Sequence, residues 1–326
     1  MSQNFEMKIN PLPAKTWNWL HMNGTVLKEE IITERGTVKA DRPETVTETE
    51  CRMENLIKPE TQIETAEDCA QKKRNLSQIK TGMGTEMDAF ADAGITIDAT
   101  FGGLASYSYA HLLAPTKVQR DIAFTFFKRA IDMTVDMGAK IMGTPVGGMD
   151  YHDARDPQRR EELYQDMLEY LRKLAEYGKT KGLEEIHIEA TPLITEFPHS
   201  PEVSVQMMKD LEGTDIPIKL LVDWGHALYK PLLKEEADIE LWFKQCAPYI
   251  GSIHLQQTDG QWDRHWDFTH EGGIITPELI KKATTEAGLD DITQYLEVVT
   301  IFEDDDDAVY EGMKKTMDYL HKELGC

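Results

Sequence analysis

Short apolar runs alternate with longer segments of helical periodicity from about residue 84 to the C-terminus. The runs that predict strands are residues 95–103 and 141–148, EEIHIEA (184–190), KLLVDWGH (219–226), GSIHLQQ (251–257) and QYLEVV (294–299). Between the strands, residues 115–137 and 157–181 repeat apolar side chains every three or four positions, which predicts amphipathic helices. We therefore predict an α/β fold whose parallel strands close into a (β/α)8 TIM barrel with the helices outside. The glycine-rich strand ends lack a GxGxxG motif, which argues against a dinucleotide-binding fold.

The N-terminal residues 7–23 predict a first strand and the loop that follows it. This loop carries Trp17, Asn18, Trp19 and His21, which would lie at the lip of the barrel. Two roles stay open for the tryptophans, namely contact with a substrate or packing that plugs the barrel. We expect Trp17, Asn18 and His21 to contact the substrate.

Residues 24–84 have a different composition, which is rich in Thr and Glu, and contain short segments in which apolar and polar residues alternate. Such alternation predicts exposed antiparallel strands, so we expect a small inserted β-rich subdomain. A solvated loop is the alternative. The predicted TIM barrel comprises residues 1–23 and 85–326, and the insert is expected to be a docking surface, because an isolated small sheet is marginal in water.

The net charge excludes several classes of partner. The chain has 58 acidic and 35 basic residues and a formal net charge of −23, which argues against nucleic acid and against anionic membranes. The N-terminus lacks a basic segment followed by an apolar one, so a cytoplasmic protein is expected. Four cysteines without CxxC spacing are expected to be free thiols.

Four of the predicted strands each end in one possible metal ligand. The ligands are Glu189, Asp223, His254 and Glu297. Carboxyl ends of parallel strands converge in a barrel, so these side chains are expected to meet there. Each could instead have a separate structural role, but burying each charge alone would cost several kcal/mol. Three carboxylates and one imidazole suit one divalent ion, with Mn²⁺ expected first and Mg²⁺ or Co²⁺ as alternatives.

His226 follows Asp223 by three residues, beyond a turn at Gly225. We expect this imidazole to lie above the ion, where it would serve the substrate rather than the metal.

The ligands in the segments IEA, DWGH, HLQQTDG and LEVV resemble the metal site of the xylose-isomerase-like TIM-barrel superfamily. That superfamily includes sugar isomerases, ketose 3-epimerases and endonuclease IV, and the resemblance covers about residues 85–326. It implies that Glu189 and Glu297 bind the metal and shuttle a proton, and that His226 contacts sugar oxygens. Endonuclease IV has additional metal-binding histidines and a basic DNA face, which the negative charge argues against. The substrate arginine of the epimerases is not cleanly present, and Arg264 and His265 are the candidates to replace it.

The insert makes the architecture similar to the α subunits of bacterial C-glycoside deglycosidases. Those proteins work with a small β subunit and cleave the carbon–carbon bond between a 3-oxo sugar and an aromatic aglycone. The resemblance thus implies a lyase acting on 3-oxo-C-glucosides of aromatic, flavonoid-like aglycones, with a small β subunit or a second copy as partner. A ketose or sugar-phosphate isomerase or 3-epimerase is the alternative, and a non-catalytic sugar-binding barrel is a third. All catalytic outcomes begin when a proton leaves the carbon next to a carbonyl that a divalent ion polarises.

Overall fold

The structure is a computed structural model. It describes residues 90–92, 94–102 and 110–325. Residues 97–102 and 110–325 belong to one compact unit, and residues 90–92 and 94–96 belong to a second. Trp17, Asn18 and His21, together with the predicted insert at residues 24–84, lie outside the described residues.

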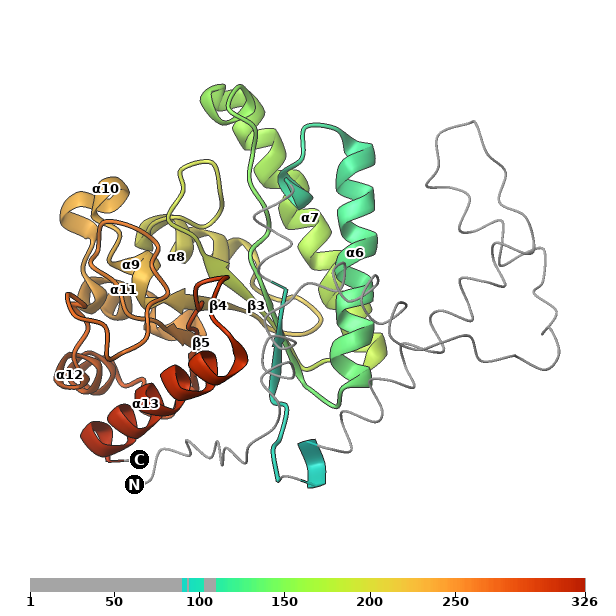
Figure 1. The fold of residues 1–326 in the computed structure, drawn as a ribbon. Coiled ribbons are helices and arrows are strands. Elements are labelled where there is room, and N and C mark those ends of the chain that lie inside the picture. The colour runs from blue at the N-terminus through green and yellow to red at the C-terminus, as the bar shows by residue number, and fades with distance from the viewer. Residues whose placement is uncertain (1–89, 93, 103–109, 326) are drawn as a thin grey trace, which may run out of the picture. The chain divides into compact units, whose positions relative to one another are not determined.

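A parallel sheet forms the centre of the larger unit (Figure 1). Its strands follow one another in chain order: β1 Ala99–Phe101, β2 Ile141–Thr144, β3 Glu185–Ala190, β4 Ile218–Asp223, β5 Ile250–Leu255 and β6 Gln294–Leu296. Each strand pairs in parallel with the next, so the predicted parallel sheet is confirmed. The described residues supply six strands rather than the eight of a closed barrel. The sheet curls enough for its ends to meet: the hydroxyl of Tyr295 on the last strand donates to Asp98 Oδ2, just before the first strand, at 2.7 Å.

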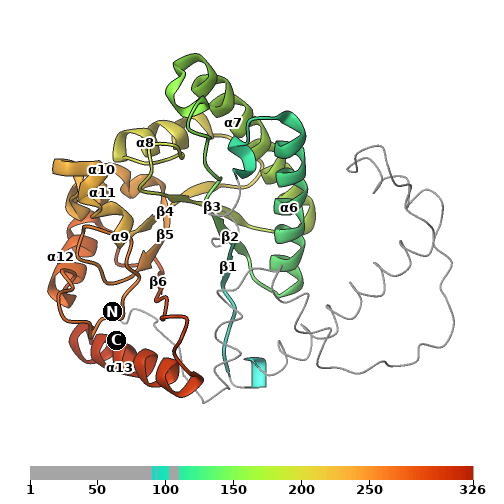
Figure 2. The same cartoon turned by 45° about the horizontal axis from the view of Figure 1, so that its top comes forward.

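Helices cover the outer face of this curved sheet (Figure 2). The α-helices are α6 Lys117–Asp136, α7 Pro157–Lys181, α8 Pro201–Asp210, α9 Trp224–Ala227, α10 Lys230–Leu233, α11 Ile239–Cys246, α12 Pro277–Ala287 and α13 Asp306–Leu324. Short 3-10 helices are η3 His111–Leu113, η4 Asp153–Arg155, η5 Lys234–Glu236 and η6 Ala247–Tyr249. None of the helices in the described part of the chain is long and apolar enough to cross a membrane.

Local sequence explains where the two long helices begin and end. Thr116 caps α6 by accepting a hydrogen bond from the Gln119 backbone N–H, and Asp156 caps α7 in the same manner. Gly182 ends α7 with a φ of 87°, which favours glycine. The predicted strand at 141–148 is shorter than expected, because Pro145 follows Thr144 and cannot donate a backbone hydrogen bond.

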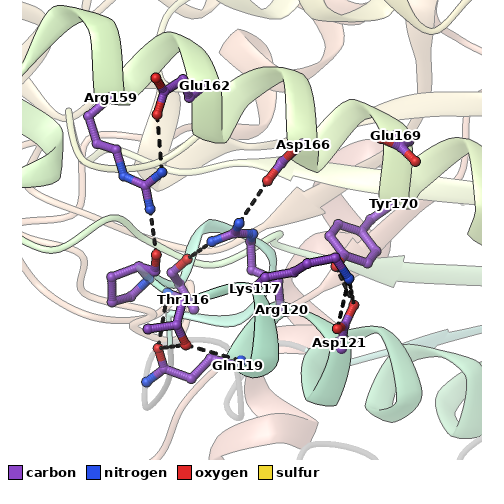
Figure 3. Close-up of polar contacts among 12 residues, drawn as sticks. Thr116, Lys117, Gln119, Arg120, Asp121, Arg159, Glu162, Asp166, Glu169 and Tyr170 are labelled. Carbon is purple, nitrogen blue, oxygen red and sulfur yellow. Dashed lines mark hydrogen bonds and ion pairs between the residues drawn. The ribbon is translucent and has the colours of Figure 1, made fainter.

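Polar contacts fasten the start of α6 to α7 (Figure 3). Arg120 is buried, and its guanidinium donates to the Ala114 carbonyl at 2.6 Å and pairs with Asp166 at 2.7 Å. Arg159 on α7 donates to the Pro115 carbonyl. The buried charge is therefore paired, and the turn that leads into α6 is held against α7.

The two faces of the sheet differ in chemistry. On β3, Ile186 and Ile188 join the hydrophobic core, while Glu185, His187 and Glu189 make polar contacts on the other face. Successive side chains of a strand point to opposite faces, so one face packs on helices and the other carries polar groups. That polar inner face positions the site described next.

Candidate metal centre

Four side chains meet at the carboxyl end of the sheet. Glu189, Asp223 and His254 lie on β3, β4 and β5, and Glu297 follows the last residue of β6. Each offers one ligand atom, and the four atoms lie within 4.8 Å of one another. His254 Nδ1 lies 2.6 Å from Glu297 Oε2 and 3.3 Å from Glu189 Oε1. The structure thus brings together every residue that the sequence nominated as a metal ligand, and binding of an ion by them stays a prediction.

Burial and charge make this cluster a fit for a cation. All four side chains are buried. Burial raises the pKa of Glu189 and of Asp223. Burial opposes protonation of His254, but the negative charges of Glu297 and Glu189 outweigh it and raise the pKa of His254 to about 10. Three carboxylates around one imidazole therefore attract positive charge into a site with little access to water, where a divalent ion would neutralise them.

Two carboxylate oxygens without hydrogen-bond partners also indicate a cation site. Glu189 Oε2 and Asp223 Oδ2 are buried, and neither has a hydrogen-bond partner among the described residues. Buried polar atoms are rarely left without partners, so these two oxygens are open to a bound cation or to water. Oxygen donors with one nitrogen suit Mn²⁺, Mg²⁺ or Co²⁺, and the donor set does not choose among them.

Asp223 is oriented by the chain that follows it. Its Oδ1 accepts from the His226 backbone N–H at 2.8 Å, which caps the short helix α9. The same oxygen accepts from Gln256 Nε2 at 2.9 Å. Both hydrogen bonds use Oδ1, so Oδ2 stays available for a ligand.

Gln256 links Asp223, a candidate metal ligand, to a second polar group, which consists of His226, Asp263 and His265. Its Nε2 also donates to Asp263 Oδ1 at 2.9 Å, and its Oε1 accepts from the His265 backbone N–H at 2.6 Å. Gln256 is fully buried, and a Cβ at Gly225 would come within 2.4 Å of its amide carbon. The glycine of DWGH is therefore required by the buried amide packed against it.

His226 lies beside the four ligands and faces a different partner. Its Nδ1 is 3.0 Å from the Ala190 carbonyl oxygen, which can only accept, so Nδ1 carries the proton. Its Nε2 is 3.3 Å from Asp263 Oδ2. Burial opposes protonation of the ring, but the charges of Asp223 and Asp263 outweigh it and raise the pKa of His226 well above its usual value. Nε2 is thus the atom that can exchange a proton with a bound molecule.

Asp263 contacts both histidines of this second group, and sequence reasoning missed it. It also accepts from His265 Nε2 at 3.0 Å. Burial would raise the pKa of Asp263, but the charge and hydrogen bond of His226, together with His265, hold it far below its usual range. The ligand atoms of His226, Asp263 and His265 also lie within 4.8 Å of one another, close enough to hold a metal ion. Both oxygens of Asp263 already accept hydrogen bonds, however, so ion pairing with the histidines accounts for the arrangement.

The two predicted replacements for the substrate arginine have different surroundings. His265 Nδ1 is 3.8 Å from Glu297 Oε2, and Asp263 raises the pKa of His265 to about 9 against the effect of burial. Arg264 instead pairs with Asp259 at 2.8 Å and lies over the Trp266 ring, 4.8 Å from its centroid. The structure thus places His265, but not Arg264, with the ligand cluster.

Glu196 is a further buried acid that sequence reasoning missed. Burial raises its pKa, and the charges of His226 and Glu189 reach it. A Cβ at Gly148 would lie 3.3 Å from Glu196 Cγ, so this glycine leaves room for the side chain. The loop after β3 therefore adds another acid at the border of the site.

Comparisons with known proteins agree with this geometry. The family model of the xylose isomerase-like TIM barrel matches residues 75–320. D-erythrulose 1-phosphate 3-epimerase of Brucella abortus (strain 2308) is 26% identical over 183 residues, which are 55% of this chain and 59% of that protein. The match spans less than two thirds of the relative's length.

Solved structures show the same fold. A candidate xylose isomerase from Rhodospirillum rubrum ATCC 11170 is 42% identical with a TM-score of 0.72, over 74% of this chain and 82% of that chain. D-psicose 3-epimerase from Clostridium cellulolyticum H10, solved with D-tagatose, is 14% identical with a TM-score of 0.59, over 76% and 85% of the two chains. The second likeness concerns the fold alone. From the family match and the Rhodospirillum relative, the chain belongs to the xylose isomerase-like TIM barrel family.

Proposed function

We propose that this chain is a divalent-metal-dependent enzyme that epimerises or isomerises a ketose or another keto sugar. The observation that carries the proposal is the set of four buried ligands within 4.8 Å at the carboxyl end of the sheet. Parallel barrels place catalysis at that end. The similarity to an epimerase acting on D-erythrulose 1-phosphate supports a keto sugar as substrate.

Different residues of the site are assigned separate roles in moving a proton. When bound, a divalent cation would polarise the sugar carbonyl and stabilise the negative charge that forms on the substrate. Glu189 Oε1 and Glu297 Oε2 lie 3.3 and 2.6 Å from His254 Nδ1, at the carboxyl ends of β3 and β6. We assign these two carboxylates to removing the proton from the carbon next to the carbonyl and to returning one.

His226 and His265 would hold the sugar oxygens. Asp223 and Asp263 raise the pKa of His226, and Asp263 raises that of His265, which favours rings that can donate a hydrogen bond to an oxygen that gains negative charge. His226 Nε2 is the atom assigned to this role: Nδ1 donates to the Ala190 carbonyl, and the Nε2 proton would be shared between Asp263 Oδ2, 3.3 Å away, and the sugar oxygen. Reprotonation on the opposite face gives an epimer, and transfer to the next carbon gives an isomer.

Cleavage of a 3-oxo-C-glucoside would begin with the same proton removal, so the site is compatible with the deglycosidase hypothesis. That hypothesis depends on the insert at residues 24–84, outside the described residues, and the relatives described above are epimerases and a candidate isomerase. Epimerisation or isomerisation is therefore the better supported reaction. Docking of a small β subunit or a second copy on the insert stays a prediction.

To test this proposal, metal-free protein is loaded with Mn²⁺ and incubated separately with each of three substrates. These are D-tagatose, D-erythrulose 1-phosphate and a 3-oxo-C-glucoside. Product configuration is followed by NMR, with Asp223→Asn as the matched control. We expect a C3 epimer or an aldose from at least one of the first two. Release of an aromatic aglycone without either product would favour the deglycosidase instead. No conversion of any substrate by the metal-loaded protein would contradict both reactions.

A further inference from the structure

A second layer of polar side chains lies on the inner face of the sheet, two residues before the metal ligands. His187 Nδ1 is 2.8 Å from Ser252 Oγ, and His187 Nε2 is 2.8 Å from Glu185 Oε2. Lys219 Nζ pairs with Glu185 Oε1 at 2.7 Å. His187 and Ser252 are each only 1% exposed, and the reaction proposed above uses neither.

The hydrogen bond between His187 and Ser252 joins strands that are not neighbours. β4 lies between β3 and β5, so no backbone hydrogen bond sets the distance between the outer two. Glu189 follows His187 by two residues, and His254 follows Ser252 by two. Side chains two apart on a strand share a face. His187 and Ser252 therefore lie across β4 from each other, along the same diagonal as Glu189 and His254. The Oε1 atom of Glu189 and the Nδ1 atom of His254 are 3.3 Å apart.

A bulge in β5 makes this crossing possible. Leu220 pairs with Ile250 while Leu221 pairs with Ser252, so Gly251 is the additional residue. A bulge bends its strand and increases the local twist. A Cβ at Gly251 would lie 2.6 Å from His187 Nε2. The glycine thus admits the imidazole at the point where the strand bends.

We propose that His187 and Ser252 are positioning residues whose hydrogen bond sets the distance between β3 and β5. They thereby hold Glu189 and His254 at the spacing that a divalent cation requires. This inference rests on the metal site of the proposed function, but not on the identity of the sugar. Metal sites depend on ligand positions to about 0.2 Å, and changes behind the ligands weaken affinity about 10- to 100-fold.

Two substitutions of His187 separate its two hydrogen bonds. The Glu185 carboxylate can only accept, so His187 Nε2 donates to it, and His187 Nδ1 makes the separate hydrogen bond with the Ser252 hydroxyl. In His187→Asn the amide lies near the position of Nδ1 and keeps the Ser252 contact. In His187→Gln the amide reaches the position of Nε2 and keeps the Glu185 contact. Each variant loses one hydrogen bond, which makes them a matched pair.

The experiment measures Mn²⁺ affinity of the metal-free, full-length proteins by titration calorimetry without sugar, together with melting temperature. Ser252→Ala and His187→Gln are expected to bind Mn²⁺ about 10- to 100-fold more weakly than wild type. His187→Asn is expected to bind nearly as tightly as wild type. The paired variants should lose similar amounts of thermal stability, so general destabilisation would not separate their affinities.

Equal Mn²⁺ affinity in wild type, Ser252→Ala and His187→Gln would overturn the positioning role. A loss in His187→Asn as large as that in His187→Gln would also overturn it, because packing rather than the Ser252 contact would then matter. If wild type binds Mn²⁺ with this pattern but converts no sugar, the proposed function fails and the positioning role stands. Wild type that binds no Mn²⁺ would contradict both.

Discussion

Asp223→Asn is expected to lose metal binding and turnover together. The amide can keep its oxygen at the position of Oδ1, where the carboxylate accepts from the His226 backbone and from Gln256. It then places an NH₂ group where the unpartnered Oδ2 lies. Elemental analysis should show about one divalent ion per wild-type chain and almost none in the variant. Metal ions contribute several kcal/mol to such reactions, so turnover should fall at least about 1,000-fold.

Asp263→Asn is the matched control, because it neutralises a second carboxylate that also accepts from Gln256. We expect this variant to keep its metal ion while sugar turnover falls. Full metal occupancy in Asp223→Asn, or loss of the ion in Asp263→Asn alone, would move the metal site to the group of Asp263 and its two histidines.

His226→Asn is expected to lose turnover while keeping the metal ion. The asparagine amide can still donate to the Ala190 carbonyl from about the position of Nδ1, but nothing replaces Nε2. Loss of a hydrogen-bond donor to an oxygen that gains negative charge typically lowers kcat about 10²- to 10³-fold, and kcat should fall by that amount. Parallel measurement of kcat and Mn²⁺ content separates the two roles.

A His226→Asn variant that binds no ion would make the imidazole a metal ligand. Unchanged kcat would remove it from the reaction altogether. His265→Asn offers a useful comparison, since its ring shares Asp263 with His226 and lies 3.8 Å from Glu297. We expect it to weaken substrate binding, seen as a higher KM, without loss of metal.

The ligand cluster could be predicted from sequence because each member ends or follows an apolar run. Parallel strands bring their carboxyl ends together, so Glu189, Asp223 and His254 had to converge once alternation of strands and helices was recognised. The long helices were predictable for a similar local reason. Thr116 and Asp156 are capping residues placed directly before amphipathic segments.

Contacts between distant residues were not visible in the sequence. His187 reads as one polar residue in an isoleucine strand, and its partner Ser252 is 65 residues away. Asp263 and Gln256 lie in a polar loop whose composition resembles that of a solvated turn, and only the fold shows that they join Asp223 to two histidines. Arg264 was a candidate because it follows His254 in the sequence, but its ion pair with Asp259 holds its side chain elsewhere.

Metal-dependent exchange of a sugar proton with solvent tests the central claim most directly. Protein stripped with EDTA and then reloaded with Mn²⁺ is incubated in D₂O with D-tagatose or D-erythrulose 1-phosphate, and the proton next to the carbonyl is followed by NMR. We predict that this proton is replaced by deuterium only with the reloaded protein, and far more slowly with the reloaded Asp223→Asn variant. Exchange that is equally fast in the stripped protein, or absent from the reloaded protein with both sugars, would contradict it.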